Sequence, residues 1–226
     1  MIDLSRDGEV FVLRLDNGEN RFGPELIEGW NQALDEVEKA DGPKALVTTG
    51  TGKFYSNGLD LDYMMSDASG DANTYLSQVM GIMERVLFFP AYTVAAMNGH
   101  AFGAGAQTAL GHDLRIMRTE RGYFCMPEVD MKADLHPGMT AIIQARLPHQ
   151  TAHEVVVTGT RYGAELALEK KIVDVILPEE EVLPHAVAVA ASYASKAHPI
   201  MGTLKRGMYP ATGAAMRTTM DFQGIP

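Results

Sequence analysis

The stretch YTVAAMNGHAFGAGAQTALGHDLRIMRT, residues 92–119, contains the pattern that decides the fold. Residues 92–99 are mostly apolar and end in Asn-Gly, which is typical of a buried strand followed by a turn. The Ala-rich segment 104–111 predicts a short helix, and 113–119 predicts a second strand. A strand, a helix and another strand at this spacing predict a parallel βαβ unit with a right-handed crossover.

The same alternation extends on both sides of this unit. The first sixteen residues alternate apolar and polar side chains around Asp7-Gly8, which predicts a β-hairpin. Beyond residue 138 the chain is expected to be mainly helical. The other expected elements are a helix over 24–39, a buried strand over 45–50, a helix over 71–88 and a late edge strand over 171–177.

Composition and charge limit what the chain can do. A chain of 226 residues fits one large domain with a sizeable core. The formal net charge of −10 argues against a nucleic-acid-binding surface, which needs a basic face. No apolar run reaches the roughly eighteen residues of a membrane span, and the first residues lack the pattern of a signal peptide. Because Cys125 is the single cysteine, no disulfide can form within the chain, and the cytoplasm is the expected compartment.

Two glycine-containing loops follow predicted strands: TGTGKFYSNGLDL (49–61) and NGHAFGAGAQTAL (98–110). Such loops gather at the carboxyl ends of parallel strands, where ligands bind. A glycine-rich loop that opens a helix presents unpaired backbone N–H groups, which can hold an anion or a developing oxyanion. The alternative is that the glycines only form turns and allow close packing of helix and sheet. Neither loop has the Gly-Lys-Ser/Thr ending of a phosphate loop, and the glycine spacing is wrong for a dinucleotide site.

Metal and cysteine chemistry find little support in the sequence. The histidines are scattered without companions at metal-ligand spacing, so no metal site is expected. Cys125 has apolar neighbours and no obvious base beside it, which is typical of an inert buried thiol. The Gly-x-Ser-x-Gly motif of serine hydrolases is also missing from the sequence.

The segment YFCMPEVDM (123–131) places Glu128 among aromatic, sulfur-bearing and aliphatic neighbours. Apolar surroundings raise the pKa of a carboxyl group toward neutrality, which suits a group that takes up and returns a proton. The alternative is a carboxylate at a solvated turn or helix start. For Asp130 and Asp134, a solvated loop is favoured over a role as auxiliary acids.

The order of these segments resembles one known family. GKFYSNGLDLDYM, AAMNGHAFGAGAQTALGHDLRIM and GYFCMPEVDM, followed by YGAELALEKKIVDVIL, are similar to the crotonase (enoyl-CoA hydratase/isomerase) superfamily. The resemblance implies an α/β fold, a crotonase-like spiral of ββα units with a short C-terminal helical region. It divides the chain into a spiral core over 1–195 and a helical or oligomerisation segment over 196–226. That last segment looks short for the family, and its weak periodicity is more typical of an appendage than of a core.

The resemblance also implies an acyl-CoA thioester as the substrate, with no separate cofactor because coenzyme A is part of the substrate. The backbone N–H groups of Leu59 and Ala104 would hold the thioester oxygen as it becomes an enolate. The other expected substrate-binding residues are Ser56, Asn57, Gly58, Asp60, Leu61, Phe102, Gly103 and Gln107. Lys205 and Arg206 are candidates for the CoA phosphates, with a solvated basic pair as the alternative. A homotrimer or a dimer of trimers is expected, with neither nucleic acid nor membrane as a partner.

The acid and base residues select the reaction within this family. Its hydratases generally use two glutamates, whereas here the two positions are Gln107 and Glu128, and a glutamine cannot take and return a proton. One carboxylate is enough to move a proton from C2 to C4, and the likeness is greatest to peroxisomal and plant Δ3,Δ2-enoyl-CoA isomerases. An isomerase of unsaturated fatty acyl-CoA with Glu128 as the catalytic residue is therefore predicted. The alternatives are a hydratase-like enzyme, an acyl-CoA binder without isomerase activity, or a thioesterase or decarboxylase relative. A peroxisome is the alternative compartment, although the final Gly-Ile-Pro is not a peroxisomal tripeptide.

Overall fold

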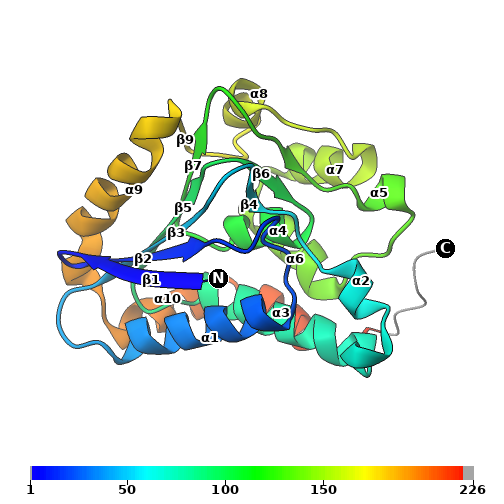
Figure 1. The fold of residues 1–226 in the computed structure, drawn as a ribbon, viewed down its shortest axis with the longest axis horizontal. Coiled ribbons are helices and arrows are strands. Elements are labelled where there is room, and N and C mark those ends of the chain that lie inside the picture. Colours follow the sequence, from blue (N-terminus) through cyan, green and yellow to red (C-terminus); the bar gives the residue numbers. More distant parts are fainter. Residues whose placement is uncertain (1, 221–226) are drawn as a thin grey trace.

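Two β-sheets with surrounding helices make up the protein, of which the computed structural model describes residues 2–220 (Figure 1). Met1 and residues 221–226 lie outside the described residues, as does the end of the expected segment 196–226. The strands are β1 (Ile2–Asp7), β2 (Val10–Leu15), β3 (Ala45–Gly50), β4 (Phe54–Ser56), β5 (Tyr92–Met97), β6 (His100–Phe102), β7 (Leu114–Arg118), β8 (Phe124–Cys125) and β9 (Val175–Leu177). The helices are α1 (Pro24–Lys39), α2 (Leu61–Met64), α3 (Ala72–Leu87), α4 (Ala104–Leu110), α5 (Glu128–Met131), α6 (Pro137–Arg146), α7 (His149–Thr158), α8 (Ala164–Glu169), α9 (Glu179–Tyr193), α10 (Pro199–Met208) and α11 (Pro210–Met216).

The large sheet has the strand order β1-β2-β3-β5-β7-β9. β1 and β2 form the expected antiparallel hairpin, in which Asp7 pairs with Val10. The remaining neighbours in this sheet are parallel, as the βαβ pattern predicts. Val12, Val47 and Val94 lie side by side across three strands, and β-branched side chains of this kind pack well on a pleated surface.

The second sheet contains the short parallel strands β4, β6 and β8. Each of them follows a strand of the large sheet, and a helix follows each pair, so that a ββα unit repeats along the chain. This arrangement confirms the expected α/β spiral of ββα units. The three short strands are parallel, so the loops after Ser56, Phe102 and Cys125 leave the small sheet at the same edge. Ligands commonly bind at such an edge.

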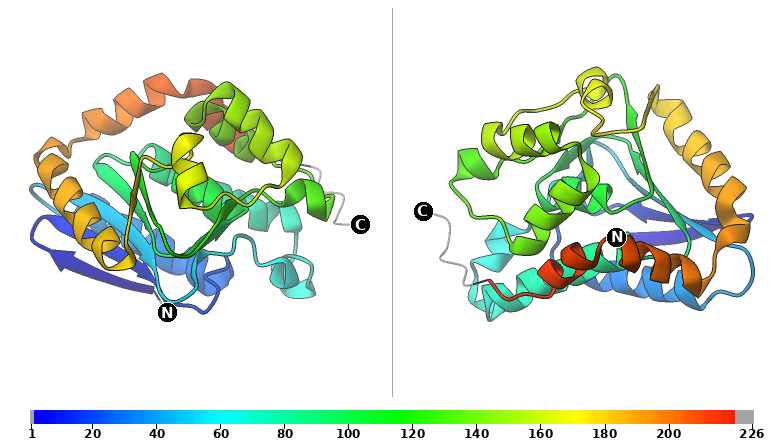
Figure 2. Two further views of the ribbon diagram at one scale, coloured as in Figure 1. Left: turned by 90° about the horizontal axis from the view of Figure 1, so that it is seen from above. Right: turned by 180° about the vertical axis from the view of Figure 1, so that it is seen from behind.

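The large sheet is covered on both faces (Figure 2). Val12 and Val47 pack with Ala186 of α9 in one buried cluster. The alternate residues Leu13 and Leu46 belong to the main core on the other face, together with α1 and α3. This alternation follows from the two-residue period of strands. The expected apolar stripe of α1, including the fully buried Trp30, faces this main core.

The region beyond residue 170 differs from the sequence-based expectations in two ways. Only 175–177 of the segment 171–177 is a strand, because Lys171 has a left-handed backbone (φ 58°) and the Ile172 N–H turns back to the carbonyl of Ala167. The edge position is confirmed, and β9 pairs in parallel with β7. The segment after residue 196 is also no mere appendage, because α11 lies against α6 and α3 and buries Met216 in the main core.

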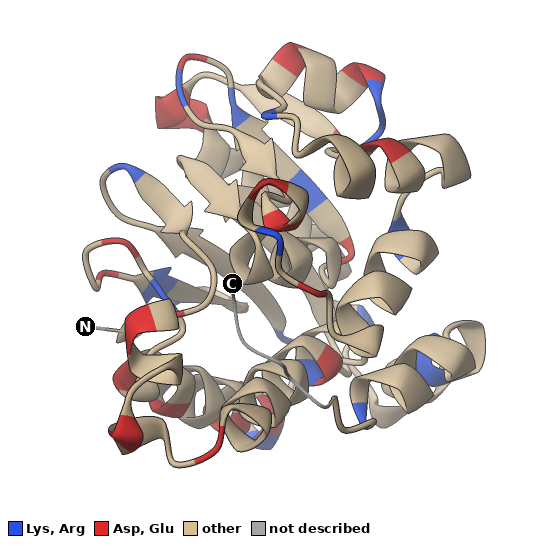
Figure 3. Cartoon of the chain, turned by 90° about the vertical axis from the view of Figure 1, so that its right-hand side faces the viewer, with Lys and Arg blue, Asp and Glu red and all other residues tan. Residues whose placement is uncertain are grey.

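Charge is unevenly distributed over the surface (Figure 3). Acidic residues follow one another around α2, where Asp60 caps the helix, Asp62 lies in its first turn and Asp67 begins the next short helical turn. Within residues 2–220, no helix combines the length and apolar character needed to cross a membrane.

Candidate active site

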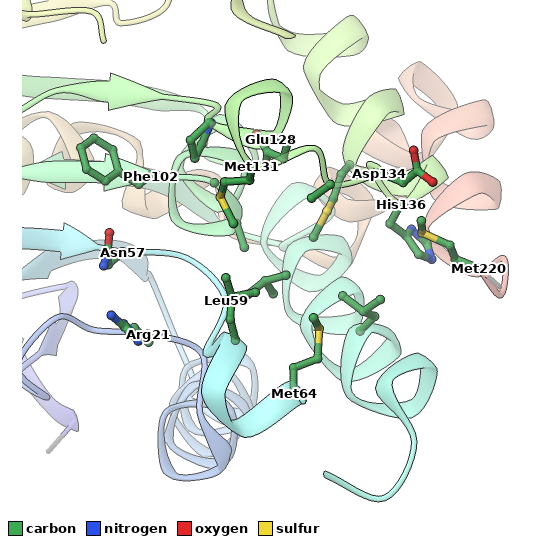
Figure 4. Close-up of a pocket in the computed structure, with 17 residues that line it drawn as sticks. Arg21, Asn57, Leu59, Met64, Phe102, Glu128, Met131, Asp134, His136 and Met220 are labelled. Atoms are coloured by element: carbon green, nitrogen blue, oxygen red, sulfur yellow. The ribbon is translucent and has the colours of Figure 1, made fainter. Parts of the chain in front are cut away.

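One elongated cavity of about 220 Å³ lies at the edge where the three loops leave the small sheet (Figure 4). Arg21 and Asn57 lie toward one end of it, and Asp134 and His136 lie toward the other. The wall between the two ends is mostly apolar, and it includes Leu61, Met64, Leu76, Met131 and Met139. Methionine side chains are flexible, so this wall can adapt to apolar chains of different shape.

The first two loops touch each other at Gly58. This residue has φ 84°, which favours glycine, and a Cβ atom there would lie 2.7 Å from the Phe102 carbonyl oxygen and 3.1 Å from the Ala104 nitrogen. Leu59 follows Gly58, and Ala104 is the first residue of α4. Both residues line the cavity, and no acceptor within residues 2–220 takes the N–H of either one. Two free donors on adjoining loops are the arrangement that stabilises an oxyanion.

The third loop brings Glu128 to the same place. Glu128 lines the cavity, and its Oε1 lies 3.6 Å from the position of a Cβ on Gly103, the residue before Ala104. Gln107, one turn further along α4, donates from Nε2 to Glu128 Oε1 at 2.9 Å. Gln107 is itself fully buried, and its Nε2 lies 3.6 Å from the sulfur of Met126.

The environment of Glu128 shifts its acidity. Burial raises the pKa of this carboxyl above its usual value, while the hydrogen bonds from its own backbone N–H and from Gln107 oppose the rise. Glu128 Oε2 and Gln107 Oε1 are buried, and no residue within 2–220 gives either of them a hydrogen bond. A carboxyl group with a raised pKa beside free N–H donors is able to exchange a proton with a ligand in the cavity.

The expected substrate-binding residues fall into two groups. Asn57, Leu61, Phe102 and Gly103 line the cavity together with Leu59, Ala104 and Glu128. Ser56, Gly58, Asp60 and Gln107 do not line it. Ser56 Oγ donates to the Asn20 carbonyl, and Asp60 caps α2 by accepting the Tyr63 N–H.

The other titratable residues on or near this wall differ in their roles. His136 caps α6: its Nδ1 accepts the Gly138 N–H, and its Nε2 donates to the Thr218 carbonyl, so the ring is neutral and burial lowers its pKa. Burial also raises the pKa of the Cys125 thiol to about 11, in agreement with an inert thiol. Asp134 is an exposed residue of the cavity wall, whereas Asp130 is exposed outside it.

The candidates for the CoA phosphates need a correction. Lys205 is buried, and its Nζ bonds to Asp113 at 2.7 Å and to the Ala91 carbonyl, so it is neither solvated nor free for a phosphate. Arg206 lies over the ring of Phe88 and outside the cavity wall. Within residues 2–220, no group of three or more His, Cys, Asp or Glu side chains is placed to hold a metal ion.

Sequence reasoning missed the residue that supports the first loop. Asn20 is fully buried with φ 52°, and its Nδ2 lies within hydrogen-bond distance of the carbonyls of Leu15, Phe54 and Tyr55. It therefore ties the end of β2 to β4, just before the Asn57–Leu59 turn. An Asn after Gly18-Glu19 is a weak turn signal, and its long-range partners are not visible from local pattern.

Known proteins resemble this chain in sequence and in fold. The sequence profile of the family described as Enoyl-CoA hydratase/isomerase matches residues 5–223. The peroxisomal enoyl-CoA delta isomerase 2 of Arabidopsis thaliana is 32% identical over 222 residues, which cover 93% of this chain and 92% of the relative. The mitochondrial enoyl-CoA hydratase of Pongo abelii is 29% identical, over 82% of this chain and 63% of the relative. The crystal structure of an enoyl-CoA hydratase from Mycobacterium ulcerans superposes with a TM-score of 0.87 at 24% identity, over 96% of this chain and 94% of that one.

The chain belongs to the enoyl-CoA hydratase/isomerase, or crotonase, family. It is a crotonase-family acyl-CoA enzyme, and both isomerases and hydratases are among its relatives.

Proposed function

We propose that this protein is a Δ3,Δ2-enoyl-CoA isomerase in which Glu128 is the proton carrier. The observation that carries the proposal is the pairing of Glu128 with an amide, Gln107, instead of a second carboxylate. Hydration of a double bond needs one group to activate water and another to protonate carbon, and an amide can do neither. An allylic shift needs only one group that takes and returns the same proton.

The chemistry uses the three loops together. Glu128 removes a proton from C2 of the 3-enoyl thioester, and the electron pair of the broken C–H bond moves into the C1–C2 bond, leaving the negative charge on the thioester oxygen. The N–H groups of Leu59 and Ala104 stabilise this oxygen. The carboxylic acid then gives the proton to C4. The C3–C4 double bond supplies the electron pair of the new C–H bond, a C2–C3 double bond forms and the carbonyl is restored.

The acidity of Glu128 suits both steps. The group must be a carboxylate to accept the first proton and an acid strong enough to return it. Burial moves its pKa upward toward the operating range, and the hydrogen bonds from its own backbone N–H and from Gln107 limit this rise.

Free positive charges near the cavity support a phosphorylated substrate. Arg161 lies 5.8 Å from the ring centroid of Phe102, which lines the cavity, and Lys53 lies 5.2 Å from that of the adjoining Phe54. No carboxylate within residues 2–220 forms an ion pair with either cation. We therefore assign these two residues, in place of Lys205 and Arg206, to the CoA phosphates, and the reaction as written needs no further cofactor.

We propose assembly into a homotrimer or a dimer of trimers, and an exposed apolar stripe on α10 supports contact between copies of the chain. Ile200, Leu204 and Met208 follow one another at intervals of four along α10 and are 52%, 62% and 68% exposed. Such a stripe suits contact with another copy of the chain. Leu204→Glu should lower the mass measured by light scattering if this face forms the contact, and an unchanged mass would remove it from the interface.

Hydration is the second candidate because Asp134 supplies another carboxylate on the cavity wall. The two reactions separate in one experiment with purified protein. An isomerase converts 3-hexenoyl-CoA to the conjugated 2-enoyl product, which gains absorbance. A hydratase removes the absorbance of added 2-hexenoyl-CoA. We expect rapid gain with the first substrate and little loss with the second. The reverse result would establish hydration, and acyl-CoA binding without either change would indicate a binder.

A further inference from the structure

The Gln107–Glu128 contact differs from the other glutamine–glutamate hydrogen bond of the described chain in where it lies. Gln32 donates to Glu28 Oε1 at 2.9 Å on the exposed surface of α1. Gln107 donates to Glu128 Oε1 at the same distance, but from a fully buried position. A buried contact of this kind is strengthened by the low local dielectric, and it holds the carboxylate in one orientation.

The two oxygens of Glu128 are therefore unequal. Oε1 has a committed donor, whereas Oε2 is buried and receives no hydrogen bond from any residue within 2–220. Buried polar atoms without partners are uncommon in folded proteins, and a catalytic role is one of the explanations for them. Since Glu128 lines the cavity, Oε2 is the oxygen that the protein leaves available for exchange with a bound molecule.

Gln107 lies on the same short helix, α4, as Ala104, whose backbone N–H would bind the enolate oxygen. Its backbone N–H bonds to the Gly103 carbonyl in the first turn of α4, and this turn presents the Ala104 N–H. The packing of this helix is tight, because a Cβ on Gly105 would lie 2.5 Å from the Ser56 carbonyl oxygen. Because Gln107 of this short, closely packed helix holds Glu128, the helix fixes the base relative to the oxyanion donor.

We propose that Gln107 is the positioning residue of this site: by holding Oε1 of Glu128, it leaves Oε2 as the single oxygen that carries the proton from C2 to C4. This inference rests on the proposed isomerase function. A single fixed oxygen delivers the abstracted proton directly to C4. A carboxyl group without the Gln107 contact can rotate and lose the proton to solvent first.

The other titratable and charged groups around the cavity do not account for a change in the acid limb of the pH profile. His136 on the same wall is neutral and occupied in capping α6, and the Cys125 thiol has a pKa of about 11. Asp134 is exposed, and Arg21 is paired with Glu19 at 2.7 Å. A change in the acid limb of the pH profile on altering Gln107 therefore reports on Glu128.

The test compares Gln107→Met, which keeps the length but removes the donor, with the surface control Gln32→Met. The substrate is 3-hexenoyl-CoA with deuterium at C2, and the readouts are kcat, KM, the pH profile and the share of label found at C4. For Gln107→Met we expect a roughly tenfold to hundredfold lower kcat with little change in KM. The acid limb should move to higher pH because the carboxylate has lost a donor, and the share of label transferred to C4 should fall. Gln32→Met should match the wild type in every readout.

A second variant keeps the test informative if Gln107→Met does not fold. Gln107→Glu has nearly the same shape, and it can donate to Glu128 only while protonated, so its activity should be confined to lower pH than that of the wild type. If the wild type is active and the Gln107 variants keep its pH profile and label transfer, the positioning role is overturned and the proposed function is not. A wild type that does not isomerise 3-hexenoyl-CoA at all would instead overturn the proposed function.

Discussion

Gly58 offers a direct test of how the two oxyanion loops are held together. In the substitution Gly58→Ala, the new Cβ would lie 2.7 Å from the Phe102 carbonyl oxygen and 3.1 Å from the Ala104 nitrogen. Both distances are shorter than normal contacts, so the loops must separate by several tenths of an ångström. Oxyanion donors act only within about 2.7–3.1 Å of the developing charge, and losing one costs about 3 kcal/mol of transition-state stabilisation. We therefore expect kcat on 3-hexenoyl-CoA to fall by about 10²- to 10³-fold.

The matched control is Gly52→Ala in the connection between β3 and β4, whereas Gly58 lies in the next connection, between β4 and α2. Gly52 has a similar left-handed backbone (φ 66°), but a Cβ there would have no atom within 4 Å. Both variants should lose about 1–2 kcal/mol of folding free energy from the unfavourable φ, seen as a drop of a few degrees in Tm. Only Gly58→Ala should lose activity. If its kcat stayed within about twofold of that of Gly52→Ala, the contact between the loops would not set the donor geometry.

Three further predictions concern buried titratable groups. Lys205→Met should leave the Asp113 carboxylate without its positively charged partner and destabilise the fold by about 3 kcal/mol in chemical denaturation. Part of this loss should be recovered in the double variant with Asp113→Asn, and an equally unstable double variant would argue against the ion pair. Glu128→Gln should be more stable than wild type by about 1 kcal/mol at neutral pH. The reason is that a carboxyl group whose pKa is raised in the folded state loses its stabilising contribution as the pH rises above about 4.5. The stability gain of the variant should therefore vanish below that pH. Burial lowers the pKa of His112 to about 3, so the free energy of unfolding should decline by up to about 1.4 kcal/mol per pH unit as the pH falls from 6.5 toward 3. The same slope in His112→Gln would contradict this assignment.

The long elements could be predicted because their patterns are local. The hairpin turn at Asp7-Gly8, the Trp30 stripe of α1 and the valines of β3 and β5 all repeat within a few residues. The small sheet could not be predicted in this way. β4, β6 and β8 contain 3, 3 and 2 residues, too short to show alternation, and β4 and β6 also lie inside the two glycine-containing loops.

Long-range contacts explain the other differences between expectation and structure. Lys205 reads as a solvated cation from its neighbours, but its partner Asp113 is 92 residues away in the sequence. The apolar run Ile172-Val173 reads as strand because it is buried, yet the left-handed turn at Lys171 places it in a loop. The contact between Gln107 and Glu128 likewise depends on α4 and α5 meeting at one edge of the small sheet, which no local pattern specifies.

The most direct test of the central claim is the turnover of 3-hexenoyl-CoA by Glu128→Gln, with Asp130→Asn as the control. Asp130 is an exposed carboxylate two residues away that does not line the cavity. If Glu128 is the sole proton carrier, Glu128→Gln should remain folded and bind acyl-CoA, yet isomerise the substrate at least about 10²-fold more slowly. Asp130→Asn should retain wild-type kcat. A folded Glu128→Gln variant with normal turnover would contradict the account.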